Sequence, residues 1–181
     1  MFNQITKKLF ILISGLVALS LLSGNAFAAP EVGKTYFTKH NFMFEKNRHL
    51  TTNYWRGQLV PVNSKVEVLS VDGKQMNLLF NGQTVTILNI AKHSKKTMDE
   101  IANNLLSESP VSISGKFTND ILAGQLRLGM SKEEVILTRG YPPAHKTYST
   151  EANVWVYWSS RFVQRSLVFN NNKLTQGRGI R

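Results

Sequence analysis

The sequence predicts an α+β protein with two β-rich parts that are joined by helices. Residues 32–90 contain short runs of β-type residues separated by turn signals, and a second group of such runs occupies residues 153–175. Two Ser/Thr-x-x-Glu patterns between these regions are typical of helix starts. The order of these signals indicates a small β module, a helical connector, and a second module in which helices precede strands.

Residues 1–28 are typical of a removable secretory signal. Lys7 and Lys8 precede an apolar run at residues 9–22, and Ala26-Phe27-Ala28 supplies the small residues that a signal peptidase recognises. The run is shorter than the roughly twenty residues that a membrane-spanning helix needs. We therefore expect export to the periplasm with cleavage before Ala29, which leaves about 150 residues for one domain or two small ones.

Composition and charge limit the partners and the chemistry. The formal net charge is +11, and removal of a leader with two lysines and no acids leaves +9. Such a basic chain favours anionic partners, including lipid headgroups, envelope polymers and acidic protein faces. The chain has no cysteine, which excludes disulfides, thiolate metal sites, a thiol nucleophile and a cysteine-linked lipid anchor. We therefore do not expect a lipoprotein.

Residues 29–92 are expected to form the first β module. Its five β-type runs are residues 34–44, 58–62, 65–71, 75–80 and 84–90. Asp72-Gly73 and Asn81-Gly82 separate apolar-rich runs, and such dipeptides tolerate the positive φ angles of a tight hairpin. Because about five short strands in about sixty residues leave few other closed arrangements, we predict a small β-barrel of the Src-homology-three (SH3) kind.

Residues 93–118 are expected to form a helical connector. Thr97 can cap the first turn while Glu100 reaches back from the third position, which predicts a helix at residues 98–108. Ile101 and Leu105 then lie on one apolar stripe. Pro110 is expected to prevent the helix from continuing.

Residues 119–181 are expected to form the second module. A short helix at residues 119–123 should end at Gly124, and another helix should open at Ser131 with Glu134 as its capping partner. Aromatic and branched residues then predict three antiparallel strands, at residues 153–158, 162–169 and 173–175. The expected order is two helices followed by three strands.

Ordered short motifs in this region resemble a known family. They are Gly124, Leu128-Gly129-Met130-Ser131-Lys132-Glu133-Glu134-Val135, Gly140-Tyr141-Pro142-Pro143, Trp155-Val156-Tyr157-Trp158, Leu167-Val168-Phe169 and Lys173-Leu174. In this order they are similar to the SmpA/OmlA (BamE-like) family, over about residues 120–175. The resemblance implies an αα-βββ fold and a non-enzymatic role, since the best known members are outer-membrane lipoproteins that support β-barrel assembly through protein and acidic phospholipid. This chain has no lipid-bearing cysteine and adds a β module, so we expect a periplasmic relative.

The residues of the shared motif have structural explanations. They are Gly129, Met130, Ser131, Glu134, Gly140 and Pro142. We expect Gly129 to give a sharp entry to the helix that Ser131 and Glu134 cap. Gly140 and Pro142 should then turn the chain into the sheet.

Three groups of aromatic and basic residues are candidates for an interaction surface. They are Tyr54, Trp55 and Arg56; Trp155 and Tyr157; and Arg161 and Arg165. Alternating rings and cations suit acidic polymers, and two strand arginines could form a basic patch. Each group also has an ordinary explanation, namely a solvated loop, packing between the two modules, or a solubilising face.

The sequence carries no signature of catalysis. His40, His49, His93 and His145 are scattered without a supporting motif, so we expect no enzyme, no cofactor and no metal site. Two functions remain open. One is a periplasmic scaffold that supports envelope or outer-membrane protein assembly by protein contact. The other is a binding module for peptidoglycan, lipopolysaccharide or acidic phospholipid, and export makes nucleic acid an unexpected partner.

Overall fold

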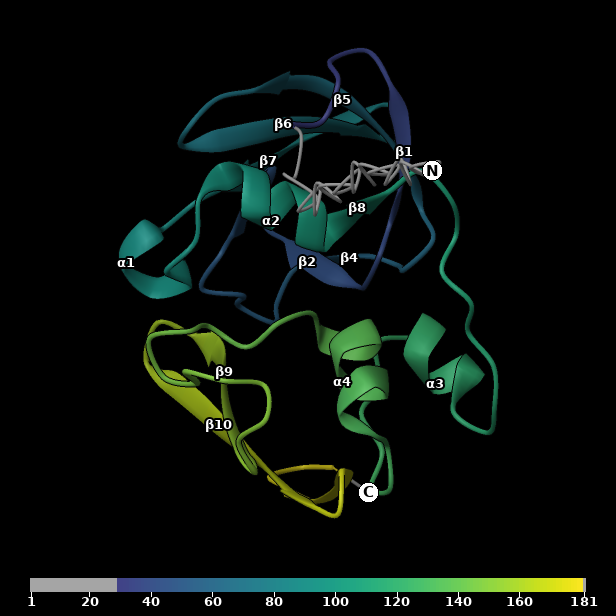
Figure 1. Cartoon of the computed structure of the whole chain (residues 1–181), viewed down its shortest axis with the longest axis vertical. Coiled ribbons are helices and arrows are strands. Elements are labelled where there is room, and N and C mark those ends of the chain that lie inside the picture. Colours follow the sequence, from purple (N-terminus) through teal and green to yellow (C-terminus); the bar gives the residue numbers. More distant parts are fainter. Residues whose placement is uncertain (1–28, 181) are drawn as a thin grey trace, which may run out of the picture.

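The computed structural model describes residues 29–180, so the predicted leader lies outside the described residues. This part of the chain is a mixed α+β structure of mostly strands and a few short helices. Figure 1 shows two halves stacked along the long axis, with the N-terminal half in blue and teal and the C-terminal half in green and yellow. Within residues 29–180, no helix is both long and apolar enough to cross a membrane.

The N-terminal half is built on a six-stranded sheet with the order β3-β7-β6-β5-β1-β8. The strands are β1 (Thr35–Thr38), β3 (Arg48–Leu50), β5 (Lys65–Val71), β6 (Gln75–Phe80), β7 (Gln83–Leu88) and β8 (Leu106–Ser107). The short strands β2 (Phe42–Phe44) and β4 (Gln58–Val60) pair separately. The predicted hairpin at Asn81 and Gly82 is confirmed, because both residues have positive φ, 48° and 77°, between the paired strands β6 and β7.

The predicted closed barrel is wrong. Among the described strands, the edge strands β3 and β8 are not hydrogen-bonded to each other, so the sheet stays open. Strand β3, which was not predicted, pairs in parallel with β7. The core is completed by other elements, since Phe42, Val60 and Met98 pack in the same buried cluster as the valines of β5. In a closed barrel, the sheet itself would enclose this apolar surface. Here it is covered by the paired strands β2 and β4 and by helix α2 (Met98–Leu105).

Two helices follow the sheet, α1 (Ala91–Ser94) and α2 (Met98–Leu105). The capping box of α2 is confirmed, because the Thr97 side chain accepts from the Glu100 amide and the Glu100 carboxylate accepts from the Thr97 amide. The helix ends three residues before the predicted end. Leu106 and Ser107 do not continue the helix and instead form the edge strand β8, which pairs with β1. Their backbone N–H and C=O groups are therefore satisfied by strand pairing and not by helix hydrogen bonds.

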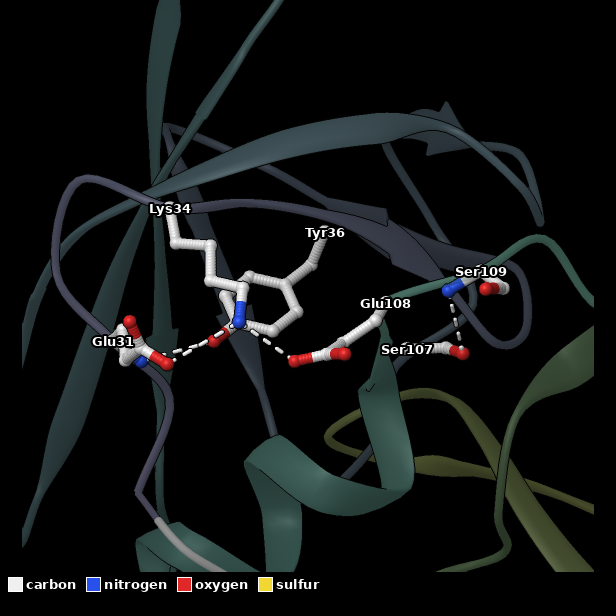
Figure 2. Close-up of polar contacts among 6 residues, drawn as sticks. All are labelled: Glu31, Lys34, Tyr36, Ser107, Glu108 and Ser109. Carbon is white, nitrogen blue, oxygen red and sulfur yellow. Dashed lines mark hydrogen bonds and ion pairs between the residues drawn. The ribbon is translucent and has the colours of Figure 1, made fainter.

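A surface ion pair ties the beginning of the described chain to the end of β8 (Figure 2). The Lys34 ammonium lies 2.6 Å from a Glu108 carboxylate oxygen and 3.2 Å from one of Glu31. The Tyr36 hydroxyl accepts from the Glu31 amide nitrogen at 3.0 Å. Both acids hold the Lys34 pKa above its usual range, but these side chains are exposed, so the pairs contribute little to stability.

The C-terminal half contains α3 (Thr118–Leu122), α4 (Lys132–Arg139), β9 (Val154–Ser160), β10 (Val163–Asn170) and β11 (Lys173–Gly177). The strands form an antiparallel sheet with the order β11-β10-β9. The predicted order of two helices and three strands is confirmed. The capping box of Ser131 and Glu134 at the start of α4 is also confirmed.

Two glycines of the shared motif, Gly129 and Gly140, lie at the two ends of α4 with positive φ angles. Gly129 has a φ of +86° just before α4, and its amide donates to the Leu174 carbonyl oxygen at 2.7 Å. Gly140 ends α4 with a φ of +71°, and a side chain there would collide with the ring of His40. Met130 and Pro142 are both buried, and Met130 belongs to the core of the C-terminal half.

Hydrogen bonds from buried side chains join the two halves. The Asn41 side-chain amide donates to the carbonyl oxygens of Ile121 at 2.5 Å and Thr138 at 3.2 Å. The Asn53 side-chain amide donates to the carbonyl oxygens of Arg139 at 2.7 Å and Tyr141 at 3.0 Å. These four bonds attach Asn41 and Asn53 of the N-terminal half to backbone carbonyl groups of the C-terminal half, in α3, in α4 and just after α4. They fix how the two halves meet.

Candidate anion-binding site

A cleft of about 550 Å³ lies where the loop after β3 meets the C-terminal half. We call it the arginine cleft, because four arginines line it: Arg127, Arg139, Arg165 and Arg178. Trp55 and Tyr157 provide aromatic walls, and no aspartate or glutamate is among the lining residues. Among residues 29–180, the cleft therefore gathers four cationic side chains and no carboxylate side chain in its lining.

Arg139 is the deepest of these cations. The residue is only 9% exposed, and its Nε is buried without a hydrogen-bond partner within residues 29–180. The guanidinium carbon lies 4.2 Å from the centre of the Trp55 ring and 5.7 Å from that of Tyr157. Burial lowers the pKa of Arg139 to about 9, which still leaves the group a cation at neutral pH. A buried cation without a carboxylate partner among the described residues is costly, and an anion in the cleft would supply such a partner.

Backbone contacts fix the position of Arg139. It is the last residue of α4, where the helix dipole favours a positive side chain. Its carbonyl oxygen accepts from the Asn53 side chain, and the next carbonyl oxygen, that of Gly140, accepts from the Tyr157 hydroxyl at 2.8 Å. The opposite wall is held as well, because the Trp55 amide donates to the Trp158 carbonyl oxygen at 3.0 Å. The cation and both of its aromatic walls are thus preorganised.

The other three arginines differ in how far they are neutralised. The Arg127 Nε lies 2.6 Å from an Asp120 carboxylate oxygen and forms an ion pair. Arg165 uses neutral partners, since its Nε donates to the Ser159 hydroxyl at 2.7 Å and its Nη1 to the Arg178 carbonyl oxygen at 3.0 Å. The Arg178 guanidinium forms no ion pair within the described part of the chain. Within residues 29–180, Arg139, Arg165 and Arg178 therefore form no ion pair with a carboxylate.

This arrangement suits a multiply charged oxyanion. A guanidinium presents parallel N–H donors that match two oxygens of a phosphate or a carboxylate. Several guanidinium groups around one space favour phosphate, because its oxygens can accept from more than one arginine at once. The cleft is also larger than the anionic group alone requires, which leaves room for the molecule that carries it.

Three of the predicted interaction residues meet in this cleft, namely Trp55, Tyr157 and Arg165. Tyr157 is only 1% exposed, so it forms the wall below Arg139 and not an open surface. Trp155 is fully buried in the core of the C-terminal half, and its Nε1 donates to the Ala152 carbonyl oxygen at 3.0 Å. Its apolar ring packs against Phe169, so Trp155 has no part in a binding surface.

The other three candidates lie away from the cleft. Tyr54 and Arg56 line a separate depression beside β3, where Arg56 pairs with Glu45 at 2.8 Å. Arg161 lies in the exposed turn between β9 and β10, with its guanidinium carbon 5.5 Å from the ring centre of Phe162. The predicted patch of Arg161 and Arg165 is therefore divided, because only Arg165 points into the cleft.

The remaining cleft arginines were not among the predicted site residues. From the sequence, Arg139 is expected to end an amphipathic helix, with the aliphatic part of its side chain facing inward. The signal that could have identified it is a cation in a position that otherwise belongs to the core, next to the helix-ending Gly140. Arg127 carries no such signal, and Arg178 lies in the exposed turn after β11.

No group of three or more histidine, aspartate or glutamate side chains within residues 29–180 is arranged to hold a metal ion. Comparisons of the whole chain with protein-family models, with curated proteins and with solved structures find no match. The geometry of the arginine cleft is therefore the main guide to function.

Proposed function

We propose that this is an exported, non-enzymatic binding protein of the cell envelope, whose arginine cleft holds a phosphate group carried by an envelope lipid or polymer. The observation that supports it is Arg139, a buried cation without a carboxylate partner, at the base of a cleft that three more arginines line. The predicted leader and the net charge of +9 without it agree with this role. Of the two functions that the sequence leaves open, the cleft favours binding of an anionic ligand.

The proposal is tested by changing one cleft arginine and one arginine elsewhere. Arg178→Gln removes an exposed, unpaired cation from the cleft, and we expect it to weaken binding of glycerol phosphate about tenfold. Arg161→Gln removes the same charge from the β9–β10 turn and is expected to leave the affinity unchanged. Calorimetric titration at several salt concentrations measures both, and binding should weaken as salt rises.

Sedimentation of the protein with three materials distinguishes which envelope component carries the phosphate group. The materials are vesicles that contain phosphatidylglycerol, lipopolysaccharide aggregates, and peptidoglycan that retains its phosphate-bearing polymers. The material that the protein binds, and that Arg178→Gln releases, identifies the carrier. Equal loss for Arg178→Gln and Arg161→Gln would contradict a specific cleft, because it would show attraction to overall charge alone.

A second candidate function is contact with an envelope protein, as a scaffold for outer-membrane protein assembly. The order of two helices and three strands supports our further proposal that residues 119–181 form a BamE-like module. Phe162 supports the protein contact, since its side chain is 84% exposed at the turn between β9 and β10, next to Val163 at 43%. Exposed apolar residues of this kind are common at protein interfaces.

Phe162→Ser provides the test of this second function. We expect the substitution to reduce cross-linking to envelope proteins at least about fivefold, because one exposed aromatic anchor can dominate a small interface. The melting temperature should stay the same, since the ring has almost no contacts within the fold. Cross-linking in whole cells followed by mass spectrometry measures the partner yield. Identical yields for the variant and the parent protein would rule out a contact through this turn.

A further inference from the structure

A second cavity, of about 490 Å³, lies between the two halves and is separate from the arginine cleft. Its walls come from the loops around β2 and β3, from the α1–α2 region and from residues 141–150 after α4. Asn53, which lines this cavity, contacts the backbone at residues 139–141 through the hydrogen bonds described above. The cavity therefore needs an explanation of its own.

Two buried histidines line this cavity, His40 and His49, each 8% exposed. The Nδ1 atom of His40 lies 2.9 Å from the Asn41 carbonyl oxygen, and that of His49 lies 2.8 Å from the Met43 carbonyl oxygen. Because a carbonyl oxygen only accepts, each Nδ1 must carry the hydrogen, and each neutral ring keeps a lone pair on Nε2. Burial lowers the pKa of both rings to about 4, so both are neutral acceptors at pH 7.

The rest of the lining is almost uncharged and combines polar groups with four apolar side chains, those of Ile87, Ile101, Leu105 and Ala144. It contains five hydroxyl side chains, two amide side chains, two tyrosines and two prolines, namely Thr51, Ser94, Thr147, Ser149, Thr150, Asn53, Asn104, Tyr141, Tyr148, Pro142 and Pro143. Lys95 and Lys96 are its only charged residues, and neither is buried. The absence of aspartate and glutamate from the lining disfavours a cationic ligand.

From this lining we infer that the cavity binds a saccharide of about two rings. A sugar offers many hydroxyl donors to the two imidazole acceptors and to the hydroxyl and amide groups of the wall. Its less polar faces can pack on the rings of Tyr141 and Tyr148, which are 38% and 88% exposed. The volume falls in the usual range for small-molecule sites. This inference is independent of the phosphate site, because no arginine lines the cavity.

Tyr148 gives the most direct test, because so exposed a side chain can be removed without loss of the fold. The purified, isotope-labelled protein is titrated with chitobiose and, separately, with maltose, and amide shifts are followed by NMR. We expect saturable shifts at residues 141–150 with millimolar affinity for at least one sugar. Tyr148→Ala should weaken that affinity about tenfold. Phe162→Ala, which removes an equally exposed ring outside the cavity, should leave it unchanged.

Two results would overturn the inference. One is the lack of saturable shifts with both sugars in a protein that is folded by its amide spectrum. The other is an equal loss of affinity in Tyr148→Ala and Phe162→Ala. Arg178→Gln separates this site from the phosphate site, since it should weaken glycerol phosphate binding and leave sugar binding intact.

Discussion

Replacement of Arg139 by methionine is expected to raise the free energy of unfolding by about 2 kcal/mol in phosphate-free buffer. The same change should weaken the binding of glycerol phosphate about a hundredfold. Arg139 is buried, its Nε has no partner, and no carboxylate lines its cleft, so the folded state bears the cost of desolvating its charge. Methionine has a similar length and can keep the packing against Trp55 and Tyr157 through its sulfur. Opposite effects on stability and binding are typical of residues that serve a ligand.

Urea unfolding followed by tryptophan fluorescence measures the stability, and calorimetry measures the binding. Arg127→Met is the matched control, because Arg127 lines the same cleft but is 42% exposed at its side chain and already paired with Asp120. We expect that control to change stability by less than about 1 kcal/mol. A loss of more than about 1 kcal/mol in Arg139→Met would contradict the idea that the fold tolerates this cation for the sake of a ligand.

Local features of this fold could be predicted from the sequence, because their physical causes lie within a few residues. The capping boxes at Thr97 and Ser131 depend on a side chain and an amide three positions apart, and both helices begin where predicted. The hairpin at Asn81 depends on two residues with positive φ. The strands of the C-terminal sheet likewise follow their runs of aromatic and branched residues.

Features that depend on distant pairing could not be predicted in this way. The edges of the first, open sheet are β3 and β8, which are too short to give a clear strand pattern in the sequence. The arginine cleft joins Trp55 to Arg139 and Arg178, which both follow Trp55 by more than eighty residues along the chain. Trp155 was a candidate for the interaction surface, but it is buried in the core of the C-terminal half. Both faces of its strand are apolar, so alternation along the strand cannot tell which face the helices cover.

The C-terminal end of α4 connects the features on which function depends. The Arg139 side chain lines the arginine cleft, while Tyr141, two residues later, lines the second cavity. Gly140 lies between them with a φ of +71°, and the His40 ring packs against it. The turn thus directs the Arg139 and Tyr141 side chains to different sites.

Acidification from pH 7.5 to pH 5 is expected to lower the free energy of unfolding by about 4 kcal/mol. His40 and His49 have folded pKa values of about 4, because burial disfavours their charged forms, whereas an unfolded histidine has its ordinary value of 6.5. Between these values the unfolded chain binds more protons, so stability is complete above pH 6.5 and is lost as the pH falls toward 4. Each ring accounts for about 2 kcal/mol of the loss at pH 5.

His93 and His145 act in the same direction, since burial lowers both of their pKa values and their stacked rings, 4.4 Å apart, repel each other when charged. Urea unfolding at a series of pH values measures the decline, and His49→Gln should reduce it by about 2 kcal/mol, because glutamine does not titrate. NMR titration of the histidine ring protons tests the same claim without a substitution. Two rings that stay neutral down to pH 5 are expected, and a stability that does not change between pH 7.5 and pH 5 would show that His40 and His49 are accessible to protons in the folded protein.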